Sequence, residues 1–214
     1  MPSRGRRRGG VVLATLFTAV CMAILVWLGL WQLERKAWKE ALLVQYAANL
    51  HAAPVAFPRE PFGHDELLFR KATAVCRDPG DWQRQAGHAR SGETGWLLIA
   101  HCRSEGSGPG FKLGLGVIGN PTQLPDWTGG PVSGVITHAP AHRSLIGSLF
   151  AKPAPQELML VADAAPPPLA PSVAPDPSSV PNNHLAYAVQ WFLFAAVALI
   201  IYALALRRRG RTIS

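Results

Sequence analysis

The stretch Asn182-Asn183-His184-Leu185-Ala186-Tyr187-Ala188-Val189-Gln190-Trp191-Phe192 decides how this chain folds. It ends a proline-rich segment and opens a run that carries no charge as far as Leu206. A run of this length is enough to cross the hydrocarbon core of a bilayer, which is about 30 Å thick. Pro181 cannot continue a helix backwards, and either asparagine can cap the amides of the first turn. The stretch therefore predicts a membrane helix over residues 182–206.

A second apolar run, residues 11–30, lies near the N-terminus. A cleaved signal peptide is the alternative interpretation, but the run is long for one and residues 26–31 offer no cleavage site with small residues. We therefore expect an uncleaved membrane helix. Small residues such as Ala14, Thr18 and Gly29 recur along one side of it. That stripe either admits a closely packed second helix or faces lipid.

The charges of the chain gather at its two ends. The formal net charge is +8, with 21 basic and 13 acidic residues. Eight arginines flank the two apolar runs: Arg4, Arg6, Arg7, Arg8, Arg207, Arg208, Arg209 and Arg211. Without those eight, 13 basic residues balance the 13 acidic ones. This distribution is typical of the positive-inside rule rather than of nucleic-acid binding, and it predicts cytoplasmic tails at residues 1–10 and 207–214.

The middle of the chain predicts a domain outside the membrane. Residues 31–54 keep a helical period and extend the first helix until prolines end it. Residues 55–163 contain short apolar runs between turn residues, as in a β-rich domain. Five candidate strands lie at residues 67–76, 95–100, 111–118, 132–137 and 158–161. Residues 164–181 carry many prolines and predict an extended linker that forms no core.

These segments together predict the fold class. We expect a membrane protein in which two transmembrane helices flank a small β-rich (α+β) extracytoplasmic domain. No hydrolase motif, P-loop or CxxC motif is present, so we expect no enzyme. The spacing Gly114-x-Gly116-x-x-Gly119 resembles a dinucleotide-binding loop, but Asn120 and Pro121 follow where that loop requires a helix.

Two cysteines, Cys76 and Cys102, belong to the predicted outside domain, and Cys21 lies in the first apolar run. An oxidising compartment permits a Cys76–Cys102 disulfide, while two buried free thiols are an equal alternative. A copper site that adds His88 and His101 is a third interpretation. Neighbouring residues of a strand point to opposite faces, so His101 and Cys102 cannot easily share a metal.

Two blocks of the sequence carry a family resemblance. Residues 182–192 resemble the second signature of the Surfeit locus protein 1 family, which assembles haem-copper cytochrome c oxidase. Residues 28–39, Leu-Gly-Leu-Trp-Gln-Leu-Glu-Arg-Lys-Ala-Trp-Lys, resemble its first signature. The resemblance implies a two-pass protein of the bacterial inner (plasma) membrane, with both termini cytoplasmic and the main domain periplasmic. It implies haem a as cofactor, and as partners the oxidase catalytic subunit and other assembly factors.

His184 is the central candidate residue. The start of a helix carries partial positive charge, which favours the neutral imidazole that coordinates metals and also attracts anions such as haem propionates. Tyr187 and Trp191 follow at helical spacing on the same face. An interfacial histidine without function is the alternative. In the resembling family the histidine of this motif is the proposed haem iron ligand, which maps onto His184.

The remaining candidates surround that histidine. We expect Gln190 to face the first helix and to hydrogen-bond Gln32 or Trp31. The predicted cofactor-binding set is His184, Tyr187, Trp191, Gln190, Trp31 and Gln32. The resemblance is thin in the outside domain: residues 92–96 carry tryptophan where the family has tyrosine, and residues 116–120 lack its arginine and tryptophan.

Three other functions stay open at this point. They are a scaffold for oxidase subunits that never touches haem, a two-helix regulator of envelope polymer synthesis, and a metal-dependent envelope enzyme. Regulators of that kind need long coiled helices outside the membrane, which the glycine- and proline-rich middle does not favour. The enzyme interpretation has only scattered histidines in its support.

Overall fold

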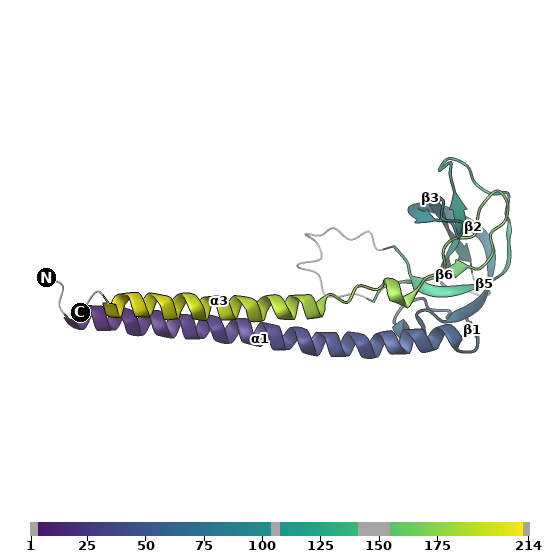
Figure 1. Cartoon of the computed structure of the whole chain (residues 1–214). Coiled ribbons are helices and arrows are strands. Elements are labelled where there is room, and N and C mark those ends of the chain that lie inside the picture. The colour runs from purple at the N-terminus through teal and green to yellow at the C-terminus, as the bar shows by residue number, and fades with distance from the viewer. Residues whose placement is uncertain (1–3, 104–107, 141–154, 212–214) are drawn as a thin grey trace. The chain divides into compact units, whose positions relative to one another are not determined.

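The computed structural model describes residues 4–103, 108–140 and 155–211 (Figure 1). The chain divides into two compact units. One comprises Met1–Leu42 and Pro181–Ser214, and the other is Leu43–Val180. The first unit is helical and the second is built on a sheet.

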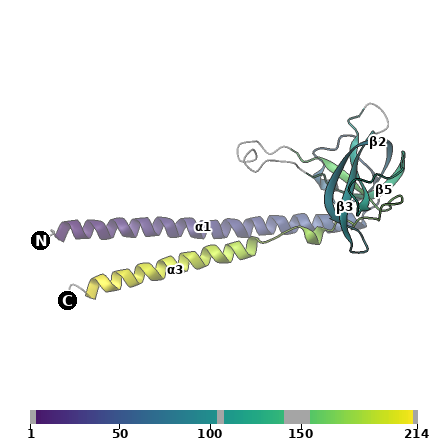
Figure 2. The ribbon, with the colours of Figure 1, turned by 90° about the horizontal axis from the view of Figure 1, so that it is seen from above.

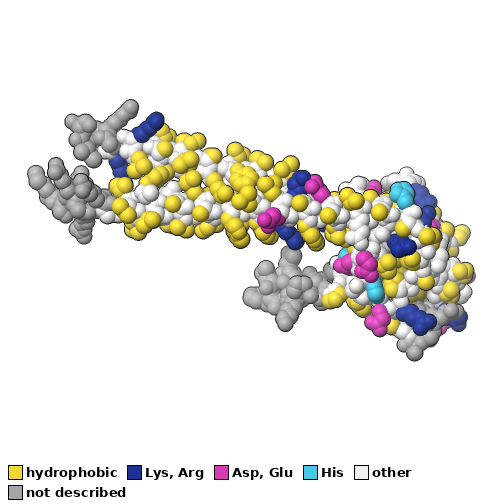
Figure 3. Space-filling model, turned by 90° about the horizontal axis from the view of Figure 1, so that it is seen from below, with side chains coloured by type: hydrophobic (Ala, Val, Ile, Leu, Met, Phe, Trp, Pro, Cys, Tyr) yellow, Lys and Arg dark blue, Asp and Glu magenta, His cyan; other side chains and the backbone are white. Residues whose placement is uncertain are grey.

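The helical unit pairs the first and last long elements of the chain. Helix α1 spans Arg4–His51 and helix α3 spans His184–Arg211. Both contain segments long and apolar enough to cross a membrane. Within the unit the two helices run antiparallel (Figures 1 and 2). On the face shown in Figure 3, hydrophobic side chains cover both helices between their charged ends. Two long apolar helices flanking a β-rich domain confirm the predicted fold class.

Small residues let the two helices approach each other. Gly29 on α1 is buried, as are Ala188 and Ala195 on α3. A Cβ atom added to Gly29 would lie 2.5 Å from the ring of Phe192, so that ring occupies the space a side chain would need. At Gly29 the first helix therefore faces α3, and the lipid-facing interpretation is wrong at that position.

The β unit is a six-stranded sheet that closes on itself. Its strands are β1 (Val55–Ala56), β2 (Lys71–His88), β3 (Thr94–Arg103), β4 (Phe111–Ile118), β5 (Gly129–His138) and β6 (Leu158–Ala162). The order is β1-β2-β3-β4-β6-β5, and β2 also pairs with β5. Strands β2 to β6 thus form a small barrel (Figure 2), and β1 pairs with β2 beside it. Pairs β1–β2 and β4–β6 are parallel, and the others are antiparallel.

The core of the barrel comes from the apolar runs recognised in the sequence. Every residue of β6 is buried, and β4 is buried except for Lys112, which is half-buried. The largest fully buried side chains are aliphatic: Leu98, Ile99, Leu113, Leu115, Ile136, Leu158 and Leu160. Lys112 pairs with Glu157 at 2.8 Å between Nζ and Oε2. Burial of these aliphatic side chains is the main favourable term that holds the unit together.

Strand β2 differs from its predicted bounds at both ends. A 3₁₀ helix, η1 (Asp65–Leu67), and a positive φ of 64° at Phe69 precede it, so pairing begins at Lys71. The strand also continues beyond Cys76 to His88. Its pairing with β3 shifts register around Gly80, and Asp78 and Asp81 both have positive φ. These irregularities let one long strand bend from β5 to β3.

The prediction that residues 164–181 form a linker outside any core is wrong. Leu169 and Ser172 are buried, and Ala170 exchanges two backbone hydrogen bonds with Val117 of β4. A further bond joins the amide of Val173 to the carbonyl of His88. The segment is extended, as its prolines dictate, but it lies against the barrel because its few non-proline amides find strand partners there. A short 3₁₀ helix, η2 (Pro177–Ser179), follows it.

The last turns of α1 belong to the β unit. Tyr46 is buried with its ring 5.0 Å from that of Phe69. The side-chain amide of Asn49 donates to the carbonyls of Glu66 and Leu68 at 2.7 and 2.8 Å. The helix ends at His51, three residues before Pro54, where the sequence had indicated a stop.

Candidate functional site

The start of α3 is set by the residues that precede it. Pro181 has no N–H to donate, and the first helical bond runs from the Tyr187 amide to the Asn183 carbonyl at 3.3 Å. This places Asn183 at the cap position and His184 at the first helical residue. The Asn182 side-chain oxygen is buried and has no hydrogen-bond partner among the described residues. His184 therefore occupies the mouth of the helix, as predicted.

A hydrogen bond joins His184 to the other helix. Its Nδ1 lies 2.7 Å from Oε1 of Gln32 on α1, and the pair is partly buried. An amide oxygen accepts and cannot donate, so in the neutral ring this contact places the proton on Nδ1 and leaves the lone pair on Nε2. This is the tautomer in which a histidine presents Nε2 to a metal while its other nitrogen is held in place.

The helix pair is fixed along its length by contacts on the same side. Phe192 fills the space at Gly29, and the Thr15 and Tyr202 hydroxyls are hydrogen-bonded to each other farther along the pair. Together with the Gln32–His184 bond, these contacts set the antiparallel register. The His184 ring is thus positioned by the packing of two helices and not by its own helix alone.

The predicted aromatic neighbours differ in their surroundings. Trp191 is half-buried, and its ring meets that of Phe194 edge-on with centroids 6.0 Å apart. Tyr187 is 51% exposed, so its ring is open to whatever lies beside the helix. Both side chains come from the same two turns of α3 as His184. Among the described residues, the Tyr187 ring is left largely uncovered and the Trp191 ring is covered in part.

Two of the expected contacts are wrong. Gln190 was expected to face α1, but it is exposed, and Gln32 accepts its hydrogen bond from His184 instead. Trp31 was expected to take part in the same contact, yet it is 42% exposed. On a helix, consecutive residues point about 100° apart, so a face that presents Gln32 to α3 turns Trp31 away.

The pairing of Gln32 with His184 has a signal in the sequence. Gln32 comes two residues after the first apolar run, and His184 comes one residue before the second. In an antiparallel pair of membrane helices those two positions lie at the same depth. Counting outward from the ends of the apolar runs would have matched the histidine with this glutamine.

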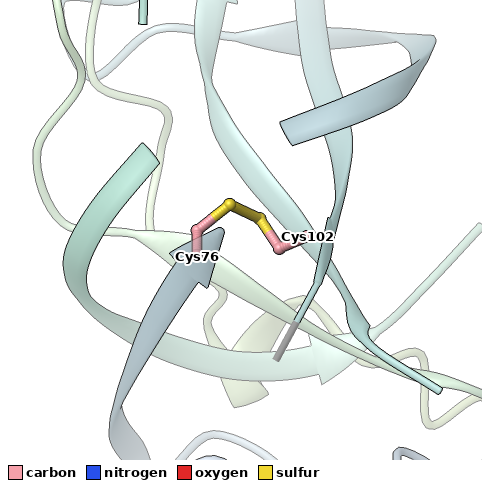
Figure 4. Close-up of a disulfide and its surroundings, with 2 residues drawn as sticks. All are labelled: Cys76 and Cys102. Atoms are coloured by element: carbon pink, nitrogen blue, oxygen red, sulfur yellow. A yellow bond between two sulfur atoms is a disulfide. The ribbon is translucent and has the colours of Figure 1, made fainter. Parts of the chain in front are cut away.

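The cysteines of the β unit form no metal site. Cys76 of β2 and Cys102 of β3 are joined by a disulfide (Figure 4), and both are buried. This confirms the disulfide and excludes the copper site and the two free thiols that were its alternatives. Within the described residues, no group of three His, Cys, Asp or Glu side chains is arranged to hold a metal ion. Cys21 on α1 is a free thiol.

Comparison with known families agrees with the two sequence signatures. The model of the SURF1 family matches residues 19–196. This range includes the C-terminal part of α1, the whole β unit and the N-terminal part of α3. The chain belongs to the SURF1 family. This family is known for cytochrome c oxidase assembly factors and is not a known family of enzymes. A search of the curated proteins found no match to this SURF1-family chain.

Proposed function

We propose that this SURF1-family protein serves cytochrome c oxidase assembly by binding haem a at His184 and passing it to the oxidase catalytic subunit. The observation that carries the proposal is the 2.7 Å bond between His184 Nδ1 and Gln32 Oε1. A histidine that ligates a metal almost always has its second ring nitrogen held in this way.

The residues present suit a haem. His184 supplies one neutral nitrogen, Nε2, and haem iron commonly takes an axial histidine ligand. Tyr187 and Trp191 supply aromatic surface for the macrocycle. The first-turn amides of α3 face the same end and favour the negative charge of propionates. A bound haem would supply the redox-active iron that the oxidase needs, while these residues hold and orient it.

The chain's own residues also suggest where this takes place. We place the protein in the plasma membrane of a bacterium, with the His184 end of the helix pair at the periplasmic surface. The arginine-rich ends of both helices support that orientation through the positive-inside rule. The disulfide supports an oxidising compartment around the β unit.

The decisive experiment is the optical spectrum of the purified protein from cells that make haem a. For His184→Ala we expect the Soret band to be lost or shifted, because the coordinating nitrogen is gone, while the protein still inserts and accumulates. For Gln32→Leu we expect haem to be retained but about 10- to 100-fold more weakly, because the ring nitrogen loses its partner. Gln45→Leu is the matched control, since that glutamine is exposed on α1 and belongs to the β unit, and it should bind as the wild type does.

The opposite result is equally informative. If His184→Ala binds haem a with an unaltered spectrum and supports normal oxidase assembly, the haem site is refuted. The scaffold interpretation, in which the protein contacts oxidase subunits without touching haem, then takes its place.

A further inference from the structure

A pocket in the β unit opens beside a short stretch of the β2 edge, around Val75, on the side away from β5. Among the described residues this stretch has no strand partner between the pairing with β1 at Thr73 and the pairing with β3 at Arg77. Its volume is about 530 Å³, and it is bounded by the end of β1, the first residues of β4, and residues near the start of β2 and of β5. Phe57 and Phe111 lie in its wall with ring centroids 5.1 Å apart. Phe111 is buried, whereas Val75, which also lines the pocket, is 39% exposed. The pocket is separate from the His184 site, which belongs to the other unit.

The edge arises because β1 is only two residues long. Val55 and Ala56 pair with Ala72 and Thr73, and the amide of Phe57 donates to the Thr73 carbonyl at 2.9 Å. Pro58 follows, and proline has no N–H with which to continue a ladder. The chain bends away there, so β1 stops after one further hydrogen bond.

Val75 is the next residue of β2 that faces this edge. Backbone groups alternate along a strand, so Val75 directs its N–H and C=O to the same side as Thr73. The opposite neighbour of Val75 is Pro131 of β5, a residue that cannot donate, which fits this orientation. In the part of the chain that the structure describes, no backbone hydrogen bond extends the β1–β2 ladder to Val75.

The pocket also carries charge of one sign. Arg59 is exposed and is the one charged residue among the described residues that line the pocket. The other polar side chains of the lining are the hydroxyls of Thr73 and Ser133. A ligand that fits must therefore combine an apolar group for the two phenylalanines with a negative charge for Arg59.

We propose that this pocket binds an extended peptide segment of a partner protein, which adds to β2 at Val75. Its backbone pairs with the Val75 N–H and C=O, an apolar side chain contacts Phe57 and Phe111, and an acidic side chain pairs with Arg59. This is strand addition to an open sheet edge, in which main-chain bonds give affinity and pockets for alternate side chains give specificity. The proposal does not depend on haem binding at His184.

The test uses the full-length protein in nanodiscs and fluorescein-labelled peptides Thr-Val-Thr-Xaa-Thr-Glu, with Xaa as Leu, Phe or Ala, measured by fluorescence anisotropy. We expect saturable binding that is tighter with Leu or Phe than with Ala. Methylating the backbone nitrogens of the best peptide should weaken its binding by about tenfold or more, because each buried hydrogen bond removed costs roughly that factor. This arm needs no variant of the protein.

Two variants locate the site. Val75→Pro removes the N–H at the open edge, where proline is tolerated in a strand, and should weaken binding about tenfold or more. Arg59→Gln should weaken the Glu peptide about two- to fivefold and leave its Gln analogue unchanged, as for an exposed ion pair. Lys71→Gln, on the same strand outside the pocket, is the matched control for charge and should change nothing. The haem spectrum of each variant should match that of the wild type.

Several results would overturn the proposal. One is that none of the peptides binds, and another is that Val75→Pro and the methylated peptide bind as well as their parents. A third is that octanoate displaces the peptides while backbone methylation has no effect, because the pocket then takes an apolar carboxylate and not a strand. A different result would bear on the haem site alone. If the wild-type protein binds the peptides but shows no haem spectrum, the His184 site is refuted and the peptide site is not.

Discussion

At the scale of single residues, Asp176 shows how a short motif is held just before the chain returns to the helical unit. Its carboxylate caps η2: Oδ2 accepts from the Ser178 hydroxyl at 2.7 Å, and Oδ1 accepts from the Ser178 amide at 2.8 Å. The hydroxyl bond, followed by the amide bond, lowers the pKa of Asp176 below its ordinary value. Because the pKa is lower in the folded state, this cap stabilises the fold at pH values above the ordinary pKa of an aspartate. That stability is lost as the pH falls through the pKa of Asp176 in the folded state.

Removal of the hydroxyl donor should therefore raise the pKa of Asp176. In Ser178→Ala the amide bond remains, so we expect the pKa to move part of the way back towards its ordinary value. The measurement is an NMR titration of the Asp176 carboxyl carbon. Ser179→Ala is the control, because the Ser179 hydroxyl bonds the backbone carbonyl of Asp176 and not its carboxylate. An equal shift in both variants would contradict the assignment of the effect to the Ser178 hydroxyl.

The candidate site was predictable from sequence in its members but not in its contacts. His184 and Gln32 both came from the two signature blocks, since polar residues beside long apolar runs stand out. Their partnership did not, because sequence fixes the order of residues on each helix but not the rotation of one helix against the other. The prediction that Gln190 faces α1 assumes the wrong rotation of α3 about its axis. The packing of Phe192 on Gly29 sets the observed rotation, in which His184 contacts Gln32.

At the scale of elements, the helix pair depends on the absence of a side chain at Gly29. In Gly29→Val the new atoms would collide with the Phe192 ring, and overpacking of this kind costs about 1–3 kcal/mol. Cys21 lies between Thr15 and Gly29 on α1. Ala198 lies between Tyr202 and Phe192, which are the contacts of those two residues on α3. We therefore expect Ala198→Cys to form an oxidative cross-link with Cys21, and Gly29→Val to reduce its yield.

Two controls separate packing from a general loss of the helix. Gly10→Val lies on the same helix with no atom near the added Cβ, so the cross-link yield should not change. Phe192→Ala combined with Gly29→Val should restore much of the yield, because the ring that collides is gone. A yield that stays low in the double variant would show that the Gly29–Phe192 contact does not control the pairing.

Elements of the β unit were predictable where apolar runs were continuous. The runs that became β3, β4, β5 and β6 lay close to their final bounds, because buried strands read as short apolar segments. Strand β2 was cut short at Cys76, since Asp78-Pro79-Gly80 has the composition of a turn. The structure uses those residues as an irregularity within a bent strand. The prediction that residues 164–181 form a linker without a core fails for a related reason. Composition shows that prolines keep a chain extended, but it does not show which strand that chain lies against.

At the scale of the whole molecule, two independent features favour one orientation in the membrane. The eight arginines outside the two apolar runs sit at the N-terminal end of α1 and the C-terminal end of α3, which lie together in the antiparallel pair. Lysine and arginine are retained on the cytoplasmic side. The disulfide lies in the β unit, which is the segment between the two membrane helices in the sequence. Disulfides persist in oxidising compartments. Both features thus support the proposed orientation, in which the β unit is exported.

Reporter fusions test that orientation directly. An exported phosphatase inserted after Gly119, in the exposed turn between β4 and β5, should be active, and a cytoplasmic reporter at the same position should be inactive. After Ser214 the pattern should reverse, because the arginines of the C-terminal tail hold that end inside. Replacing Arg207, Arg208, Arg209 and Arg211 with glutamine should weaken the preference at the C-terminus while the phosphatase after Gly119 stays active, since the four N-terminal arginines still anchor α1. Activity of the cytoplasmic reporter after Gly119 would contradict the orientation, and the periplasmic haem site at His184 would have to be abandoned with it.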